Sequence, residues 1–152
     1  MRTGKLGVDL IKRFEGFSAT MYYDPVGLPT IGYGTLIDTA SEQYLLTATL
    51  SVEQAESLLR LELWHTEQAI NKMVAVALNQ CQYDALVSFA YNLGSGALRR
   101  STLLRKLNTN PDDPTIRAEF LRWVNAGGRV LRGLVRRRQA EADLYFGIYD
   151  MT

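Results

Sequence analysis

The sequence contains few of the residues that bind metals or cross-link chains. Its 152 residues include one cysteine, Cys81, and one histidine, His65. A single cysteine excludes an internal disulfide, and a lone histidine without cysteine partners lacks the ligand set of a zinc site. We therefore expect no metal and no cofactor. We interpret Cys81 as a buried, inert thiol and His65 as a surface or boundary residue.

Long apolar runs are also missing. No stretch reaches the roughly 18 consecutive apolar residues that a membrane-spanning helix needs. The first nine residues carry charges where a signal peptide has an uninterrupted apolar segment. We expect a protein that is made in the cytoplasm, does not insert stably into a membrane, and leaves only when something else releases it.

The net charge is small but unevenly distributed. The chain has 17 basic and 16 acidic residues, and 47% of its residues are hydrophobic, which is typical of one globular domain. Residues 1–98 carry six basic and ten acidic groups, whereas residues 99–152 carry eleven and six. The basic part lacks the interleaved aromatic residues of nucleic-acid binding segments. We expect it to attract an anionic polymer other than nucleic acid.

The pattern of apolar residues predicts a mainly helical α+β protein. Thr3 is expected to cap a first helix that ends at Gly16, and the glycines and prolines of residues 21–34 favour a small, largely exposed hairpin sheet. A capping box at Ser51–Gln54 begins a long helix that links this sheet region to the rest. Further helices are predicted at residues 79–94, 101–107, 115–125 and 133–146. We predict a single domain over residues 1–152, with a small lobe at about 15–50 and a helical lobe at about 75–152 plus the N-terminal helix.

Three residues of the small lobe suggest chemistry. Glu15 ends the first helix, and Asp24 and Thr30 lie on the hairpin that follows, so folding back can direct all three into one cleft. Two carboxylates that flank a cleft are the groups that glycoside hydrolysis requires, one as a proton donor and one acting on water. A glutamate at a helix end and an aspartate before a proline in a turn are also common structural choices. Spacing alone leaves both interpretations open.

The motifs around these residues narrow the choice. Phe14-Glu15-Gly16, Tyr23-Asp24 and Pro29–Gly34 resemble the Glu, Asp and Thr signature of the phage-type lysozymes, the glycoside hydrolase family 24 muramidases. Later segments also resemble parts of that family, in the same order: Phe89–Gly94, Phe120–Trp123, Gly127-Gly128 and Gly133–Glu141. The resemblance covers about residues 10–147.

The resemblance implies a lysozyme-like fold, in which a small N-terminal β-containing lobe is joined by a long helix to a larger helical lobe. It also implies hydrolysis of the β-1,4 bond between N-acetylmuramic acid and N-acetylglucosamine in peptidoglycan. Glu15 would be the general acid, and Asp24 and Thr30 would position the attacking water, with inversion at the anomeric carbon. Three residues would contact the substrate: Leu36, Tyr91 and Thr102.

The family further implies an endolysin that lyses the bacterial host. We expect a monomer that waits in the host cytoplasm and reaches the periplasm or cell wall after a separate holin has permeabilised the membrane. An arginine of the helical lobe would approach the acid, with Arg129 and Arg138 as candidates, and Trp64 and Trp123 are expected in the core. Two alternatives remain: a lytic transglycosylase that cuts the same bond without water, and an inactive relative that only binds the wall.

Overall fold

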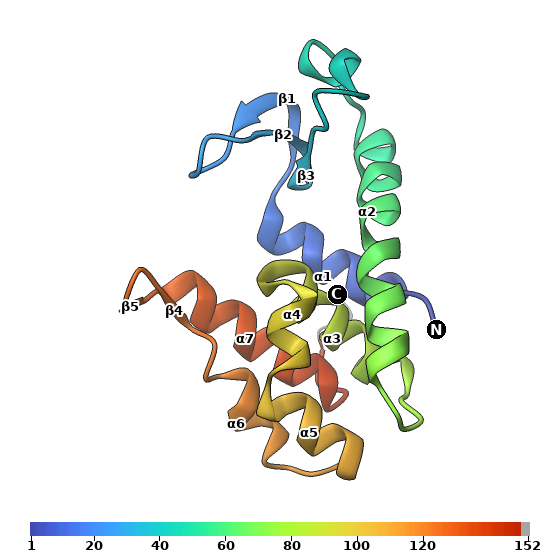
Figure 1. The fold of residues 1–152 in the computed structure, drawn as a ribbon, viewed down its shortest axis with the longest axis vertical. Helices are drawn as coiled ribbons and strands as arrows, with labels where there is room; N and C mark the ends of the chain where they lie inside the picture. The colour runs from blue at the N-terminus through green and yellow to red at the C-terminus, as the bar shows by residue number, and fades with distance from the viewer. Residues whose placement is uncertain (150–152) are drawn as a thin grey trace. The chain divides into compact units, whose positions relative to one another are not determined.

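The computed structural model describes residues 1–149 and confirms a mainly helical α+β protein (Figure 1). The helices are α1 (Lys5–Glu15), α2 (Val52–Met73), α3 (Gln80–Leu93), α4 (Ser95–Arg99), α5 (Thr102–Thr109), α6 (Ile116–Phe120) and α7 (Arg132–Tyr145), with a 3-10 helix η1 at Gln43–Leu46. The strands are β1 (Ser18–Tyr23), β2 (Pro29–Gly32), β3 (Thr35–Leu36), β4 (Asn125–Ala126) and β5 (Arg129–Val130). None of the helices in residues 1–149 is both long enough and apolar enough to span a membrane.

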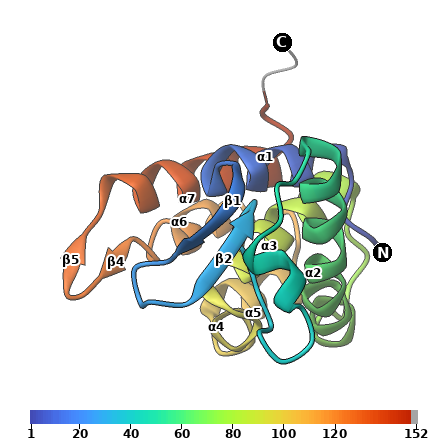
Figure 2. The ribbon, with the colours of Figure 1, turned by 90° about the horizontal axis from the view of Figure 1, so that it is seen from above.

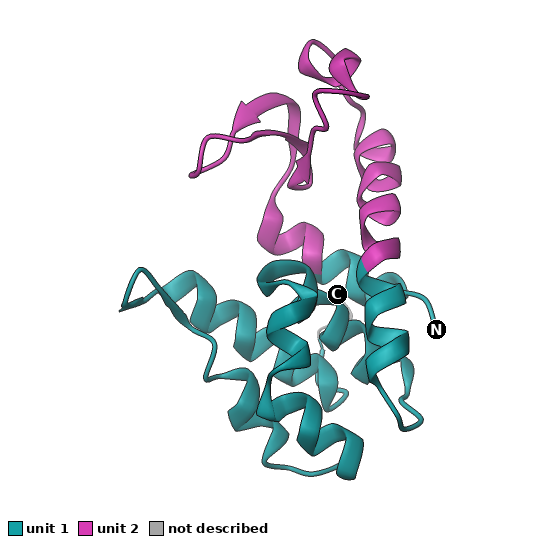
Figure 3. Ribbon diagram, in the orientation of Figure 1, with its two compact units in different colours: residues 1–10, 66–152 teal, residues 11–65 magenta. Residues whose placement is uncertain are grey.

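The chain forms two compact units (Figure 3). The first, which we call the sheet unit, consists of residues 11–65 and contains β1 to β3 and η1. The second, the helical unit, combines residues 1–10 with the chain from residue 66 onward. The long helix α2 contributes residues to both units, as the predicted linking helix should.

The sheet unit is built around three antiparallel strands in the order β1-β2-β3. Figure 2 shows β1 beside β2. The expectation of a largely exposed sheet is wrong for β2, because Thr30, Ile31 and Gly32 are buried. Pro29 is compatible with this central strand because it is the first strand residue. Ile31 packs with Ile37 and Leu45 in a small core.

The capping box predicted for the long helix is present. The Ser51 amide donates to Gln54 Oε1 at 2.8 Å, and the Gln54 amide donates to Ser51 Oγ at 3.1 Å. The predicted apolar face is buried at Ala55, Leu59, Leu63 and Ile70. Trp64 was expected in the core, but it is 49% exposed and packs edge-on against the exposed His65.

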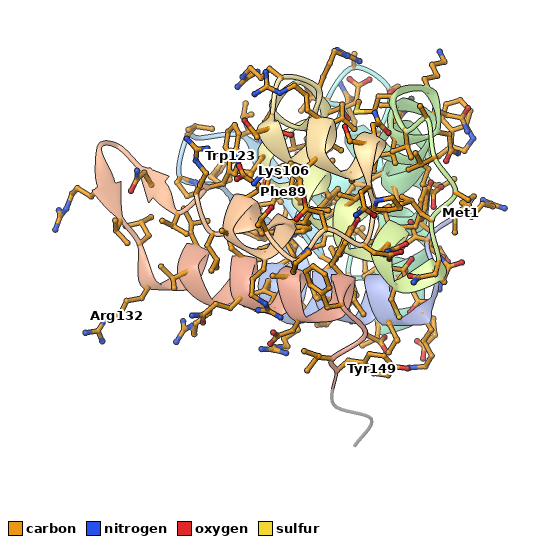
Figure 4. All side chains as sticks on the ribbon, turned by 90° about the horizontal axis from the view of Figure 1, so that it is seen from below. Met1, Phe89, Lys106, Trp123, Arg132 and Tyr149 are labelled. Atoms are coloured by element: carbon orange, nitrogen blue, oxygen red, sulfur yellow. The ribbon has the colours of Figure 1, made fainter. Side chains whose placement is uncertain are left out.

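The helical unit has an aromatic core. The Phe89 ring on α3 contacts the rings of Phe120 and Trp123, both at centroid distances of 5.7 Å. Phe89 and Trp123 are labelled in Figure 4. Phe89 and Phe120 are fully buried, whereas Trp123, expected in the core, is half-buried. Helix α3 begins at the predicted cap, where Asn79 and Gln82 form a capping box, and ends at Gly94. Helix α5 likewise begins after the predicted cap Ser101, whose hydroxyl accepts from the Leu104 amide at 3.0 Å.

Two expected helix features are wrong. The helix predicted to reach Asn125 ends at Phe120, and residues 125–130 instead form the β4-β5 hairpin around two glycines. At the N-terminus, Thr3 does not cap α1, because its hydroxyl and amide both donate to Glu67 at 2.6 Å. The cap is Asp84 of α3, whose carboxylate accepts from the Gly4 amide at 2.9 Å and the Gly7 amide at 3.1 Å.

Candidate active site

Glu15 is the last residue of α1 and is partly buried. Its carboxylate lies against the turn between β2 and β3. A Cβ atom built on Gly34 would lie only 2.8 Å from Glu15 Oε2, and Gly34 has a φ of +78°. Only glycine combines this backbone conformation with the space that the carboxylate occupies. Gly34 thus sets the position of Glu15, a role that was not inferred from the sequence.

Asp24 directly follows β1 and holds the turn that leads to β2. Its Oδ1 atom accepts hydrogen bonds from the amides of Val26, at 3.0 Å, and Leu28, at 2.8 Å. Asp24 therefore has the structural role that is common for an aspartate in a turn, and it fulfils this role through Oδ1. Within residues 1–149, Oδ2 accepts no hydrogen bond. The turn fixes the carboxylate through one oxygen and leaves the other available.

Thr30 lies on β2 and is 2% exposed. Its hydroxyl donates to the Leu28 carbonyl at 3.0 Å. Asp24 and Thr30 are thus linked through the two backbone groups of a single residue, Leu28, whose amide donates to Asp24. Since the Thr30 proton is engaged, its oxygen lone pairs can still accept a hydrogen bond from a water molecule.

The strand register places two partners on either side of Thr30. Tyr22 of β1 and Leu36 of β3 are its direct cross-strand neighbours. Directly opposed residues point to the same face of a sheet. Tyr22 is 38% exposed and Leu36 48% exposed, so the buried Thr30 lies between two accessible side chains. Leu36, predicted from the resemblance as a substrate contact, therefore adjoins a predicted catalytic residue.

Tyr22 is a site residue that sequence reasoning missed. Burial raises the pKa of its phenol, and the negative charges of Glu15 and Asp24 raise it further. Both carboxylates are therefore close enough to act on one hydroxyl, which stays protonated and able to donate. Alternation along β1 places Tyr22 and Tyr23 on opposite faces, but this signal can be used only once the strand is known to reach Tyr23.

The remaining predicted contacts belong to the helical unit. Tyr91 lies on α3 and is partly buried. Thr102 is the first residue of α5, and its hydroxyl accepts from Arg105 Nη2 at 2.8 Å. The structure thus groups Glu15, Asp24, Thr30 and Leu36 in the sheet unit, while Tyr91 and Thr102 are in the other unit.

The two candidate arginines are in very different surroundings. Arg138 is fully buried, pairs with Glu141 and Asn92, and donates to the Trp123 carbonyl at 3.1 Å. Arg129 is exposed on β5. Within residues 1–149, no group of three His, Cys, Asp or Glu side chains is arranged to hold a metal ion.

Comparisons with known proteins identify the family of this chain. A family model described as phage lysozyme matches residues 12–141. The chain is 41% identical to an endolysin of Bacillus phage PZA over 95% of this chain and 55% of the relative. It is 37% identical to an endolysin of Salmonella phage P22 over 93% of this chain and 97% of the relative.

Solved structures have the same fold. A crystal structure of a P22 lysozyme mutant superposes with a TM-score of 0.84 at 36% identity, covering 96% of this chain and 99% of the other. The muramidase domain of SpmX from Asticaccaulis excentricus gives a TM-score of 0.82 at 36% identity, covering 95% and 97%.

The mainly helical fold with a small N-terminal sheet is that of a lysozyme-like protein. The family match extends over most of the residues and agrees with the sequence resemblance. The chain belongs to the phage lysozyme family. It spans about half the length of the relatives from Bacillus phages PZA and B103, 55% and 54% respectively.

Proposed function

We propose that this protein is an endolysin with muramidase activity, acting as a single catalytic domain over residues 1–152. Its substrate is peptidoglycan, and the bond cleaved is the β-1,4 linkage between N-acetylmuramic acid and N-acetylglucosamine. Its relatives in phages PZA and P22 are named endolysins, and the SpmX domain is named a muramidase. These names support a wall-degrading enzyme.

One observation carries the catalytic part of the proposal. Two carboxylates, Glu15 and Asp24, act on the same phenol, Tyr22, and lie in clearly different surroundings. Glu15 is packed against the Gly34 backbone, whereas Asp24 accepts two amide hydrogen bonds. Two carboxylates in different surroundings suit two different roles in one reaction.

In the proposed reaction, Glu15 donates its proton to the glycosidic oxygen as the bond breaks. Asp24 Oδ2 takes one proton from a water molecule, and the Thr30 hydroxyl oxygen accepts a hydrogen bond from that water's other O–H group. This hydrogen bond aims the lone pair of the water at the anomeric carbon. Attack by water on the face opposite to the leaving group inverts the configuration. The bound sugars contact Leu36, next to Thr30, and also Tyr91 and Thr102.

The proposed route to the substrate follows from the wall lying outside the membrane. The protein accumulates in the host cytoplasm as a monomer and reaches the periplasm or wall after a holin permeabilises the membrane. Expression in bacteria with and without a coexpressed holin tests this route, since lysis should require the holin.

Replacing the proton donor tests the catalytic proposal. Glu15→Gln should clear permeabilised cells at least about 100-fold more slowly than the unchanged protein, because a general acid contributes 10²–10⁴-fold. The matched control is Glu53→Gln, an exposed glutamate near the start of α2, which should retain full activity. Clearing at the normal rate by Glu15→Gln would contradict the assignment.

The products distinguish hydrolysis from transglycosylation. Mass spectrometry of the released muropeptides should show reducing ends and no anhydro sugar, and NMR of fresh product should show the inverted anomer. Asp24→Asn and Thr30→Ala should both lose activity, because each removes one partner of the water. Anhydro products, with activity retained in both variants, would identify a lytic transglycosylase.

A further inference from the structure

The β4-β5 hairpin differs from the rest of the helical unit in being wholly exposed. Its two short strands pair Asn125 with Val130 and Ala126 with Arg129. The tight turn is made by Gly127 and Gly128, with φ of +59° and +76°. All residues from 125 to 133 are exposed. In Figure 1 the hairpin projects from the helices of its own unit.

The charge around the hairpin has one sign. Between Glu119 and Glu141 the sequence contains six arginines and no acidic residue. Three of these arginines are used internally: Arg137 and Arg138 pair with Glu141, and Arg122 pairs with Glu119. The other three are exposed and form no ion pair in residues 1–149: Arg129, Arg132 and Arg136. Figure 4 shows Arg132 pointing away from the body of the unit.

Two aliphatic side chains lie between the arginines. Val130 is 64% exposed and Leu131 is 43% exposed, and they separate Arg129 from Arg132 in the sequence. Single exposed aliphatic residues are ordinary on protein surfaces. An adjacent pair at a projecting hairpin, flanked by unpaired guanidinium groups, presents apolar and cationic groups together.

We propose that the β4-β5 hairpin, with Arg132 and Arg136 at the start of α7, docks on the surface of an anionic lipid bilayer. Arginines there contact lipid phosphates, while Val130 and Leu131 enter the boundary between headgroups and acyl chains. Such binding is peripheral and reversible, because two aliphatic side chains are far too few to anchor a protein.

The same features argue against other partners. A carboxylate polymer would satisfy the arginines but would leave the aliphatic pair without a role. Single-stranded nucleic acid is bound with aromatic stacking surfaces, and the sequence has no aromatic residue between Trp123 and Tyr145. A second copy of the chain would bring two sets of unpaired arginines together, which like-charge repulsion disfavours.

Vesicle sedimentation with the full chain tests the proposal. The protein should pellet with vesicles of phosphatidylethanolamine and phosphatidylglycerol, should do so less as salt rises, and should not pellet with phosphatidylcholine vesicles. Each basic residue near an anionic surface is worth about a fivefold change in partition. Arg129→Gln with Arg132→Gln should therefore weaken binding by roughly 25-fold.

Two further variants separate the hairpin from net charge. Arg99→Gln with Arg100→Gln removes the same charge from exposed positions at the end of α4 and should weaken binding only slightly. Val130→Ser with Leu131→Ser should weaken binding without changing its salt dependence. Equal loss in the two arginine pairs, no effect of the serine pair, or binding to purified sacculi without binding to vesicles would each overturn the proposal.

Discussion

The close approach of Gly34 to Glu15 leads to a prediction about a residue with no side chain of its own. Gly34→Ala should slow lysis at least about tenfold, because its Cβ would displace the carboxylate and the positive φ adds roughly 1–2 kcal/mol of strain. Rates on permeabilised cells and melting temperatures measure the two effects. Gly147→Ala is the control, since Gly147 has a φ of +75° with nothing within 4 Å of the added Cβ. Equal loss of activity in both variants would show that strain alone is responsible.

Tyr22 provides a second prediction at the same scale. Removing its hydroxyl in Tyr22→Phe should lower kcat/KM by up to about tenfold, because the phenol lies close enough to Glu15 and Asp24 to interact with both. Rates of lysis of permeabilised cells measure this loss. Tyr23, 66% exposed and on the opposite face of β1, is the control. If Tyr23→Phe reproduced the loss, Tyr22 would have no special role.

The sequence carried different amounts of information about these residues. Glu15, Asp24 and Thr30 could be named because their types and spacing match a family signature. The role of Gly34 could not be predicted from the sequence, because it depends on a contact between its turn and Glu15, which lies 19 positions earlier. Tyr22 could have been found from strand alternation, but only after β1 was known to reach Tyr23.

At the scale of elements, the pairing of α3 with α7 depends on a buried ionic cluster. Glu141 is fully buried, accepts from Ser88 at 2.5 Å and from Arg137 Nε at 3.3 Å, and also pairs with Arg138. Glu141→Gln should destabilise the protein by about 3–5 kcal/mol, since the buried guanidinium group of Arg138 loses its counter-charge and that of Arg137 loses one of its partners. Thermal or denaturant unfolding measures this loss.

The control for Glu141 lies on the same helix. Asp143 pairs with Arg117 at 2.9 Å, with side chains 44% and 37% exposed. Exposed pairs contribute about 0–1 kcal/mol, so Asp143→Asn should have little effect on unfolding. Comparable destabilisation by both variants would show that burial does not set the strength of these pairs.

Helix starts could be predicted where hydrogen bonds between residues close in the sequence determine them. Caps at Ser51, Asn79 and Ser101 mark real helix starts, because one side chain satisfies amides only a few residues away. The helix expected at residues 115–125 failed after Phe120, since residues 125–130 pair as a hairpin. Thr3 does not cap α1, because the amides at the start of this helix donate to Asp84 of α3 instead. A contact between residues so far apart in the chain cannot be predicted from a local pattern.

For the whole molecule, ion pairs determine the response to acid. The ammonium group of Lys106 and, more weakly, Arg122 lower the pKa of Glu119, and Lys12 and Arg60 do the same for Glu56. A lowered folded pKa stabilises the protein above the unfolded pKa, and this contribution is lost as the pH falls through the folded value. Stability should therefore fall as the pH drops below about 5.

Glu119→Gln tests this dependence. The variant should melt at a lower temperature than the unchanged protein at pH 7, and the difference should shrink as acid protonates the Glu119 carboxylate. Glu53→Gln, at an exposed position, should follow the unchanged protein at every pH. A difference for Glu119→Gln that stayed constant with pH would rule out the carboxylate charge as its cause.

The bond between Asp84 and the start of α1 affects the order of events during synthesis. The amide of Gly4 leaves the ribosome first, but its acceptor lies 80 positions later in the chain. The unit to which both belong also includes the helices from residue 66 onward. The amides of Gly4 and Gly7 therefore cannot reach their acceptor until at least the first 84 residues have been translated. A chain that stalls before residue 84 cannot form these two hydrogen bonds.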